Sequence, residues 1–149
     1  MTEGQPAPTT YSEVLTMTVT LHNIEGKGAP VGFSHASAAR GNLIVHVAGQ
    51  VGENDEGVIA EGLTAQAEQA LRNVARAFDA AGAAVTDLVK TTLYVVGWDP
   101  SKFDALVAGL LAAQVDHPFP DAPLTLIGVQ SLFTPDHLIE IEAVAVVDG

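Results

Sequence analysis

The chain has 149 residues, no cysteine and a formal net charge of −12 at pH 7, and 48% of its residues are hydrophobic. This length predicts one domain, and the apolar fraction is high enough for a packed core. The absence of cysteine excludes disulfides, thiolate metal ligands and cysteine nucleophiles. The six basic residues are scattered, without a stripe that would neutralise phosphates, so we expect no nucleic-acid partner.

The longest run without a charged residue, 122–135, contains two prolines and is too short for a membrane span, which needs about 18 apolar residues. The N-terminus has no basic segment leading into an apolar run, as a secretory signal would. We therefore expect a cytoplasmic protein with no membrane partner.

The first third of the chain predicts a tail and three strands. Residues 1–13 are polar and rich in proline and threonine, which indicates a flexible tail before a domain at 14–149. Residues 17–22 alternate as a strand does. Residues 33–39 and 43–50 indicate two further strands, and Arg40-Gly41-Asn42 between them predicts a hairpin turn.

Two helices are predicted in the middle of the chain. Ala67, Leu71, Val74 and Phe78 recur at helical spacing, and Gly82 stands where a C-cap glycine belongs. A strand over 87–96 follows. Asp99 and Pro100 then form a favourable helix start. The apolar face expected for this second helix consists of Phe103, Leu106, Val107, Leu110 and Leu111.

Two closing strands lie within 123–146, which gives the order β-β-β-α-β-α-β-β. This order predicts an α+β fold in which two helices cover one face of a mixed sheet. Several strands are nevertheless apolar on both faces and need burial on both sides. We therefore expect a homo-oligomer with sheet faces inward and helices outside. The strand segments concerned are 43–47, 93–96, 124–129 and 144–147.

Two acids, Glu140 and Glu142, interrupt the last strand, and alternation places both on the face opposite Ile139, Ile141 and Ala143. A carboxylate near a subunit interface is unfavourable unless it is paired or hydrated. One interpretation is a salt bridge between subunits or a solvent-exposed strand end. The other is an acid lining a cleft, where burial would suit it to proton transfer.

Other kinds of chemistry have little support in the sequence. None of the five histidines is paired at the spacing of metal ligands, so we expect no metal site. No nucleophile elbow is present. The glycine-containing loops match neither a Walker pattern nor a dinucleotide fingerprint, so we expect no cofactor.

Several short segments, in this order and spacing over about 32–147, resemble the Rid/YjgF superfamily of reactive-intermediate (enamine/imine) deaminases. The segments that carry the resemblance are Val47-Ala48-Gly49-Gln50, Gln66, Gln69 to Val74, Ala80 to Ala83, Asp87 to Thr92, Gly128-Val129 and Ile139 to Val146.

The resemblance implies a chorismate-mutase-like fold, a homotrimer, and small-molecule clefts between neighbouring subunits. It also implies hydrolysis of enamines or imines to a keto acid and ammonia, without a metal or cofactor.

The polar site residues of these deaminases are mostly replaced in this chain. Their carboxylate-binding arginine aligns with Leu124, a tyrosine with Phe33, a serine with Ala48 and a helix asparagine with Val107. The water-positioning glutamate is kept as Glu140. The chain is therefore identified as a divergent member whose cleft is apolar.

Two functions follow from this pattern. In the first, a divergent hydrolase uses Glu140 to position water and backbone N–H groups around Gly49 and Leu126 to polarise the substrate, with His35 as a substitute polar group. In that case the substrate is less anionic than an amino-acid imine. In the second, the trimer has lost the deaminase chemistry and serves as a ligand-binding or partner protein.

Overall fold

The computed structural model describes residues 19–28 and 30–149. The expected tail, and the first residues of the expected domain, lie outside this part. The strands are β1 (Val19–His22), β2 (Ala36–Ala39), β3 (Leu43–Val51), β4 (Leu88–Val96), β5 (Leu124–Val129) and β6 (Ile139–Val147), and the helices are α1 (Gly62–Ala80) and α2 (Phe103–Gln114). The predicted order of strands and helices is confirmed.

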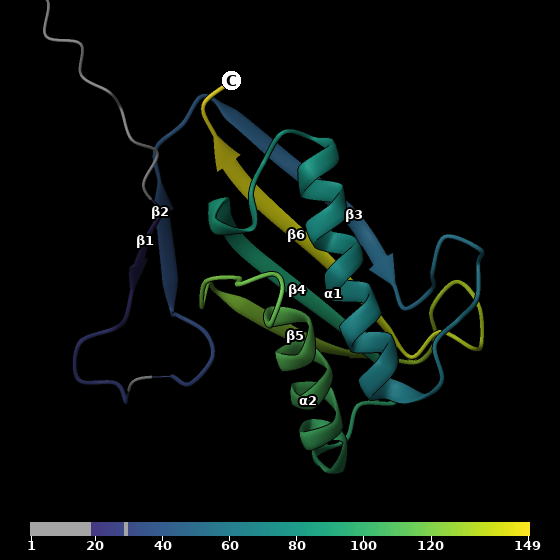
Figure 1. Cartoon of the computed structure of the whole chain (residues 1–149). Coiled ribbons are helices and arrows are strands. Elements are labelled where there is room, and N and C mark those ends of the chain that lie inside the picture. The colour runs from purple at the N-terminus through teal and green to yellow at the C-terminus, as the bar shows by residue number, and fades with distance from the viewer. Residues whose placement is uncertain (1–18, 29) are drawn as a thin grey trace, which may run out of the picture.

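The main sheet has four strands in the order β3-β6-β4-β5. β6 is antiparallel to both of its neighbours, β3 and β4, whereas β4 and β5 run parallel. The sheet is therefore mixed, as expected. Both helices lie on the same side of it, with α1 over β3 and β6 (Figure 1).

β1 and β2 form a separate antiparallel sheet beside the main one (Figure 1). The hydroxyl of Ser37 on β2 donates to the carbonyl oxygen of Val89 on β4 at 2.6 Å. The hairpin predicted around Arg40-Gly41-Asn42 is wrong, because β2 pairs with β1 and β3 pairs with β6. β6 is nine residues long and its apolar residues alternate as those of β3 do, whereas β2 is only four residues long. The longer strand can therefore form more hydrogen bonds and apolar contacts with β3.

α1 follows its prediction closely. The side chains of Ala67, Leu71, Val74 and Phe78 are all buried against the sheet. Gly82 has φ of +77°, and the N–H of Ala83 donates to the carbonyl oxygen of Phe78 at 2.9 Å, which closes the helix as a Schellman motif does.

α2 begins as predicted, after a short 3₁₀ turn at Pro100–Lys102, with the Asp99 carboxylate accepting from the N–H of Ser101 at 2.9 Å. Its predicted apolar face is partly wrong, because Phe103 and Leu111 are more than half exposed. Leu106 is buried as predicted, and the other buried residues of α2 are Gly109 and Ala113. Small residues at this contact allow the two helices to approach closely, and a Cβ at Gly109 would collide with the Thr64 carbonyl oxygen on α1.

The core lies between the helices and the sheet. Its largest fully buried side chains are Val74, Phe78, Leu93, Val95, Ile139 and Ile141. The opposite face of the sheet, called the open face here, carries the intervening residues of each strand. It is uncovered in the single chain, and Ile44 on β3 is 60% exposed there.

Candidate functional site

Glu140 is the second residue of β6 and is half-buried on the open face. It lies opposite Val51 on β3 and Tyr94 on β4. The pairing of β3 with β6 shifts between Val47 and Gln50, which is where Gly49 lies. A Cβ at Gly49 would overlap the carboxylate oxygen of Glu140. The carboxylate can therefore occupy this position only because residue 49 has no side chain.

Glu142 is two residues further along the same face, as the alternation predicted. The hydroxyl of Tyr94 donates to its Oε1 at 2.7 Å. This hydrogen bond is the main cause that raises the pKa of Tyr94 above its usual value. No local pattern in the sequence singles out Tyr94, because its hydrogen bond with Glu142 joins two strands that are far apart in the chain.

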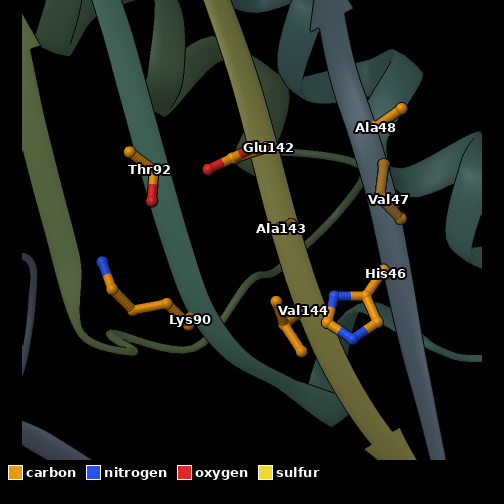
Figure 2. A pocket seen from close by; sticks show the side chains of 8 residues that line it. All are labelled: His46, Val47, Ala48, Lys90, Thr92, Glu142, Ala143 and Val144. Carbon is orange, nitrogen blue, oxygen red and sulfur yellow. The ribbon is translucent and has the colours of Figure 1, made fainter.

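Glu142 also lines a hollow of about 420 Å³ on the open face. Figure 2 shows the hollow spread over β3, β6 and β4, with Glu142 directed from β6 towards Thr92 on β4. His46 stands on the β3 side and Lys90 on the β4 side. Ala48, one of the predicted cleft residues, belongs to this wall, next to Gly49.

Leu124 and Leu126 point to the other side of the sheet. They pair with Thr91 and Leu93, both buried under the helices, and their own side chains pack against the core. Leu124 lines a narrow cavity of about 70 Å³ there. Within one chain the sheet itself therefore separates Leu124 from the carboxylate of Glu140.

Phe33 and His35 precede β2 rather than belonging to it, so the strand predicted from Phe33 begins three residues later. Their ring centroids are 6.4 Å apart with the rings nearly perpendicular. The backbone N–H of Ile24 donates to Nδ1 of His35 at 3.2 Å, and the N–H of His35 donates to Asn23 Oδ1 at 3.1 Å. His35 is thus a hydrogen-bonded loop residue.

Val107 is half-buried on α2, on the helical layer. A single chain therefore brings together Ala48, Gly49 and Glu140 but holds the other predicted cleft residues elsewhere. Among the described residues, no group of three or more histidine, aspartate or glutamate side chains could hold a metal ion.

A buried histidine near this site is absent from the sequence prediction. His137, 5% exposed, contacts Thr134 Oγ1 through Nδ1 at 2.8 Å and Glu53 Oε2 through Nε2 at 3.3 Å. Gln66 adds hydrogen bonds to the backbone of Asp136 and Leu138. Together these contacts fasten the loop before Glu140 to the segment that follows Gly49. Thr134 is only three residues from His137, but Glu53 and Gln66 are distant in sequence, so no local pattern signals their contacts with this loop.

The fold and the site define a small α+β protein with a carboxylate-bearing sheet face. The sequence model of the family described as Endoribonuclease L-PSP matches residues 24–147. The chain belongs to this family, within the Rid/YjgF superfamily, and has its chorismate-mutase-like fold.

The chain is 39% identical over 90 residues to a 2-iminobutanoate/2-iminopropanoate deaminase of Salmonella typhimurium. The matched segment covers 60% of this chain and 68% of the relative. It is 34% identical to the Rid-family protein YyfB of Yersinia pestis, a protein of unknown function, with a TM-score of 0.77 over 87% of this chain and 98% of the other. It is 28% identical to E. coli TdcF, whose structure was solved with bound serine. The TM-score is 0.62, and the match covers 69% of this chain and 80% of TdcF.

Across the described parts of the chain, the structure contains no helix with the length and hydropathy of a membrane span.

Proposed function

We propose that this protein is a Rid-type hydrolase that binds a small imine, enamine or related carbonyl metabolite in clefts between the subunits of a homotrimer. On an imine, the reaction would release ammonia and leave a carbonyl compound. The Salmonella relative, a deaminase of 2-imino acids, supports this reaction class.

The observation that carries the proposal is the carboxylate of Glu140 lying over Gly49. The missing side chain at Gly49 lets the half-buried carboxylate lie directly against the β3 backbone, where it would hold a water molecule beside the backbone N–H groups. Glu140 would accept a proton from that water as it attacks the C=N carbon, which is general-base catalysis. Backbone N–H groups near Gly49 would stabilise the charge that develops.

The trimer is supported by the open face. Ile44, Val144 and Val146 lie on it together with the two acids, and such a mixed face is usually covered in soluble proteins. A neighbouring subunit would bring its own Phe33, His35, Val107, Leu124 and Leu126 towards Glu140. This would complete a cleft that one chain holds only in part.

The substrate we propose is less anionic than a 2-imino acid. Leu124 has no charge and packs against the core, so it gives a carboxylate no bidentate partner. Burying an unpaired carboxylate is strongly unfavourable. A neutral imine or a carbonyl compound avoids this penalty. We expect no RNA cleavage, despite the description of the matched family, because the chain has six basic residues and a net charge of −12.

The second candidate is a trimer that binds a small ligand without turning it over. Its support is the same group of replacements, since Leu124, Phe33, Ala48 and Val107 remove polar groups and only Glu140 is kept. The TdcF structure was solved with bound serine, so a relative of this fold holds a small molecule.

An imine-trapping assay distinguishes the two candidates. Imines generated from a panel of amino acids and simple amines by oxidases are followed as semicarbazones, with and without the protein. Hydrolysis that is lost in Glu140→Gln, but kept in the exposed control Glu61→Gln, supports the hydrolase. If no imine is consumed faster than in buffer and Leu124→Arg creates turnover, the hydrolase proposal is wrong for the natural chain.

A further inference from the structure

Lys90 lies on β4 opposite Val144 of β6, on the open face. Its side chain is half-buried, and it lines the 420 Å³ hollow together with Thr92, Glu142 and His46 (Figure 2). The function proposed above does not use Lys90.

The amine of Lys90 is held by two neutral acceptors. Nζ donates to the carbonyl oxygen of Thr91 and to Oγ1 of Thr125, both at 2.8 Å. Of the salt bridges between described residues, none includes Lys90. A neutral amine has two N–H bonds and one lone pair, so these two acceptors satisfy its donors completely. The ammonium form has a third N–H, for which the described residues supply no hydrogen-bond partner.

Burial lowers the pKa of Lys90, although the negative charge of Glu142 acts in the opposite direction. Desolvation thus increases the share of the neutral amine, which is the nucleophilic form of lysine, while the two acceptors hold Nζ in place at the hollow. An amine of this kind next to a hollow resembles, in its physical setting, the lysines that attack carbonyl groups.

An acid–base group lines the same hollow. Glu142 points from β6 towards Thr92, which is two residues along β4 from Lys90 (Figure 2). The hydroxyl of Tyr94 bonds one oxygen of Glu142. The carboxylate has further lone pairs with which it can accept a proton from the hollow.

We propose that Lys90 is a reactive amine that condenses reversibly with small neutral aldehydes or ketones entering this hollow. The lone pair of Nζ attacks the carbonyl carbon, and the electrons of the C=O π bond move to the oxygen, which takes a proton. The nitrogen loses a proton to Glu142 through a water molecule in the hollow. The carbinolamine then expels its hydroxyl group, protonated to water, as the C=N bond forms, and the resulting iminium gives up its remaining N–H proton to solvent. The balance is amine plus carbonyl giving imine plus water, with no change of oxidation state.

The hollow favours a neutral carbonyl compound over a 2-oxo acid. A substrate carboxylate would face Glu142 on the same wall, in a protein that carries twelve excess negative charges. This site is also distinct from that of Glu140. Glu140 pairs with Tyr94, four residues from Lys90 along β4, which corresponds to about 13 Å.

Reductive trapping tests the proposal directly, because the chain has only three lysines, Lys27, Lys90 and Lys102. The full chain is incubated with propanal and cyanoborohydride near neutral pH, and alkylation at each lysine is followed by peptide mass spectrometry. We expect Lys90 to react faster than the exposed Lys27 by at least about threefold, since a desolvated lysine is the activated nucleophile. Lys90→Arg should remove that adduct and leave labelling of Lys27 unchanged, with an unaltered far-ultraviolet dichroism spectrum.

Two further arms sharpen the result. Glu142→Gln should slow trapping at Lys90 but not at Lys27, and pyruvate should label Lys90 more slowly than propanal does. Glu140→Gln should leave the labelling unchanged, which separates this site from the proposed hydrolase. Labelling of Lys90 no faster than of Lys27 would overturn the reactive amine, and faster labelling by pyruvate would overturn the preference for neutral compounds.

Discussion

On β6, Ile139, Ile141 and Ala143 are buried beneath the helices, whereas Glu140 and Glu142, between them, are half-buried on the opposite face. β4 repeats the contrast, with Leu93 and Val95 buried and the polar Lys90, Thr92 and Tyr94 on the other side. One face is packed and, apart from the buried Thr91 on β4, apolar. The other mixes apolar side chains with groups that can ionise.

This difference in composition indicates that the two faces of the sheet contribute differently to stability. Side chains on the covered face stabilise the fold, because they are removed from water on folding. Carboxylates and a lysine on the open face gain nothing of this kind and become less stable when they are desolvated without partners. Their presence on a face that also carries Ile44, Val144 and Val146 supports the proposed use of this face in assembly and ligand binding.

The largest expected effect comes from a charge placed on the open face. Ile44→Lys should abolish the proposed trimer, because it loses about 1.5–3 kcal/mol of apolar burial per subunit and buries an unpaired ammonium instead. Leu111→Lys on α2 is the matched control, since Leu111 is 58% exposed and Ile44 is 60% exposed. Sedimentation velocity measures the assembly. Dissociation by Leu111→Lys, or an intact trimer with Ile44→Lys, would contradict the roles given to the two surfaces.

The next largest effect falls on the covered face. Ile141→Ala should lower the free energy of unfolding by about 2–5 kcal/mol, because it leaves a cavity under α1 in a fully buried position. Guanidinium unfolding followed by circular dichroism measures the loss. The comparison variant, Val144→Ala, changes the open face of the same strand. It should show a smaller loss, and one that depends on protein concentration if assembly covers Val144.

Gly109 and Gly49 each lie against another part of the chain, and substituting them should affect stability in one case and activity in the other. In Gly109→Ala the new methyl group meets the backbone carbonyl of Thr64, which cannot rotate away, so we expect a loss of about 1–3 kcal/mol in unfolding experiments. In Gly49→Ala it meets the Glu140 side chain, which can rotate. This variant should stay folded and instead lose imine hydrolysis about as far as Glu140→Gln does. Equal losses of stability in the two variants would show that the Glu140 carboxylate is fixed in place.

The elements that the sequence predicted well are those with a strong local period. The four apolar positions of α1 are all buried, and the period of two along β6 placed Glu140 and Glu142 on one face. The pairing of β2 was wrong because the choice of a strand partner depends on distant segments. The buried face of α2 was partly missed because Gly109 and Ala113 contribute little hydrophobicity, although their small size is what brings the helices together.

The site was predictable only where it follows strand alternation. The contact between Glu140 and Gly49 depends on a shift in the pairing of β3 with β6. No pattern of residues in the sequence predicts this shift. The bond from Tyr94 to Glu142 and the contact from His137 to Glu53 join residues 48 and 84 positions apart. Such pairs are set by the sheet register and by loop packing, and so they appear only in the folded chain.

The smallest expected effect lies on the helical layer, far from the open face. Nη1 of Arg72 on α1 donates to Oδ2 of Asp116, just beyond α2, at 2.7 Å, and this bond lowers the pKa of Asp116. A carboxyl group whose pKa is lower in the folded state adds stability above its unfolded pKa of about 3.9 and loses it as the pH falls through the folded value. The contribution is small because Asp116 is largely exposed. Urea unfolding from pH 6 to pH 2 should therefore show a slightly steeper loss of stability with acid for the natural chain than for Asp116→Asn. The control is Asp121→Asn, because Asp121 is exposed and forms no ion pair with the described residues, and this variant should keep the natural profile. If Asp116→Asn and the natural chain lose stability in parallel, the ion pair between Arg72 and Asp116 does not contribute measurably to the stability of the helical layer.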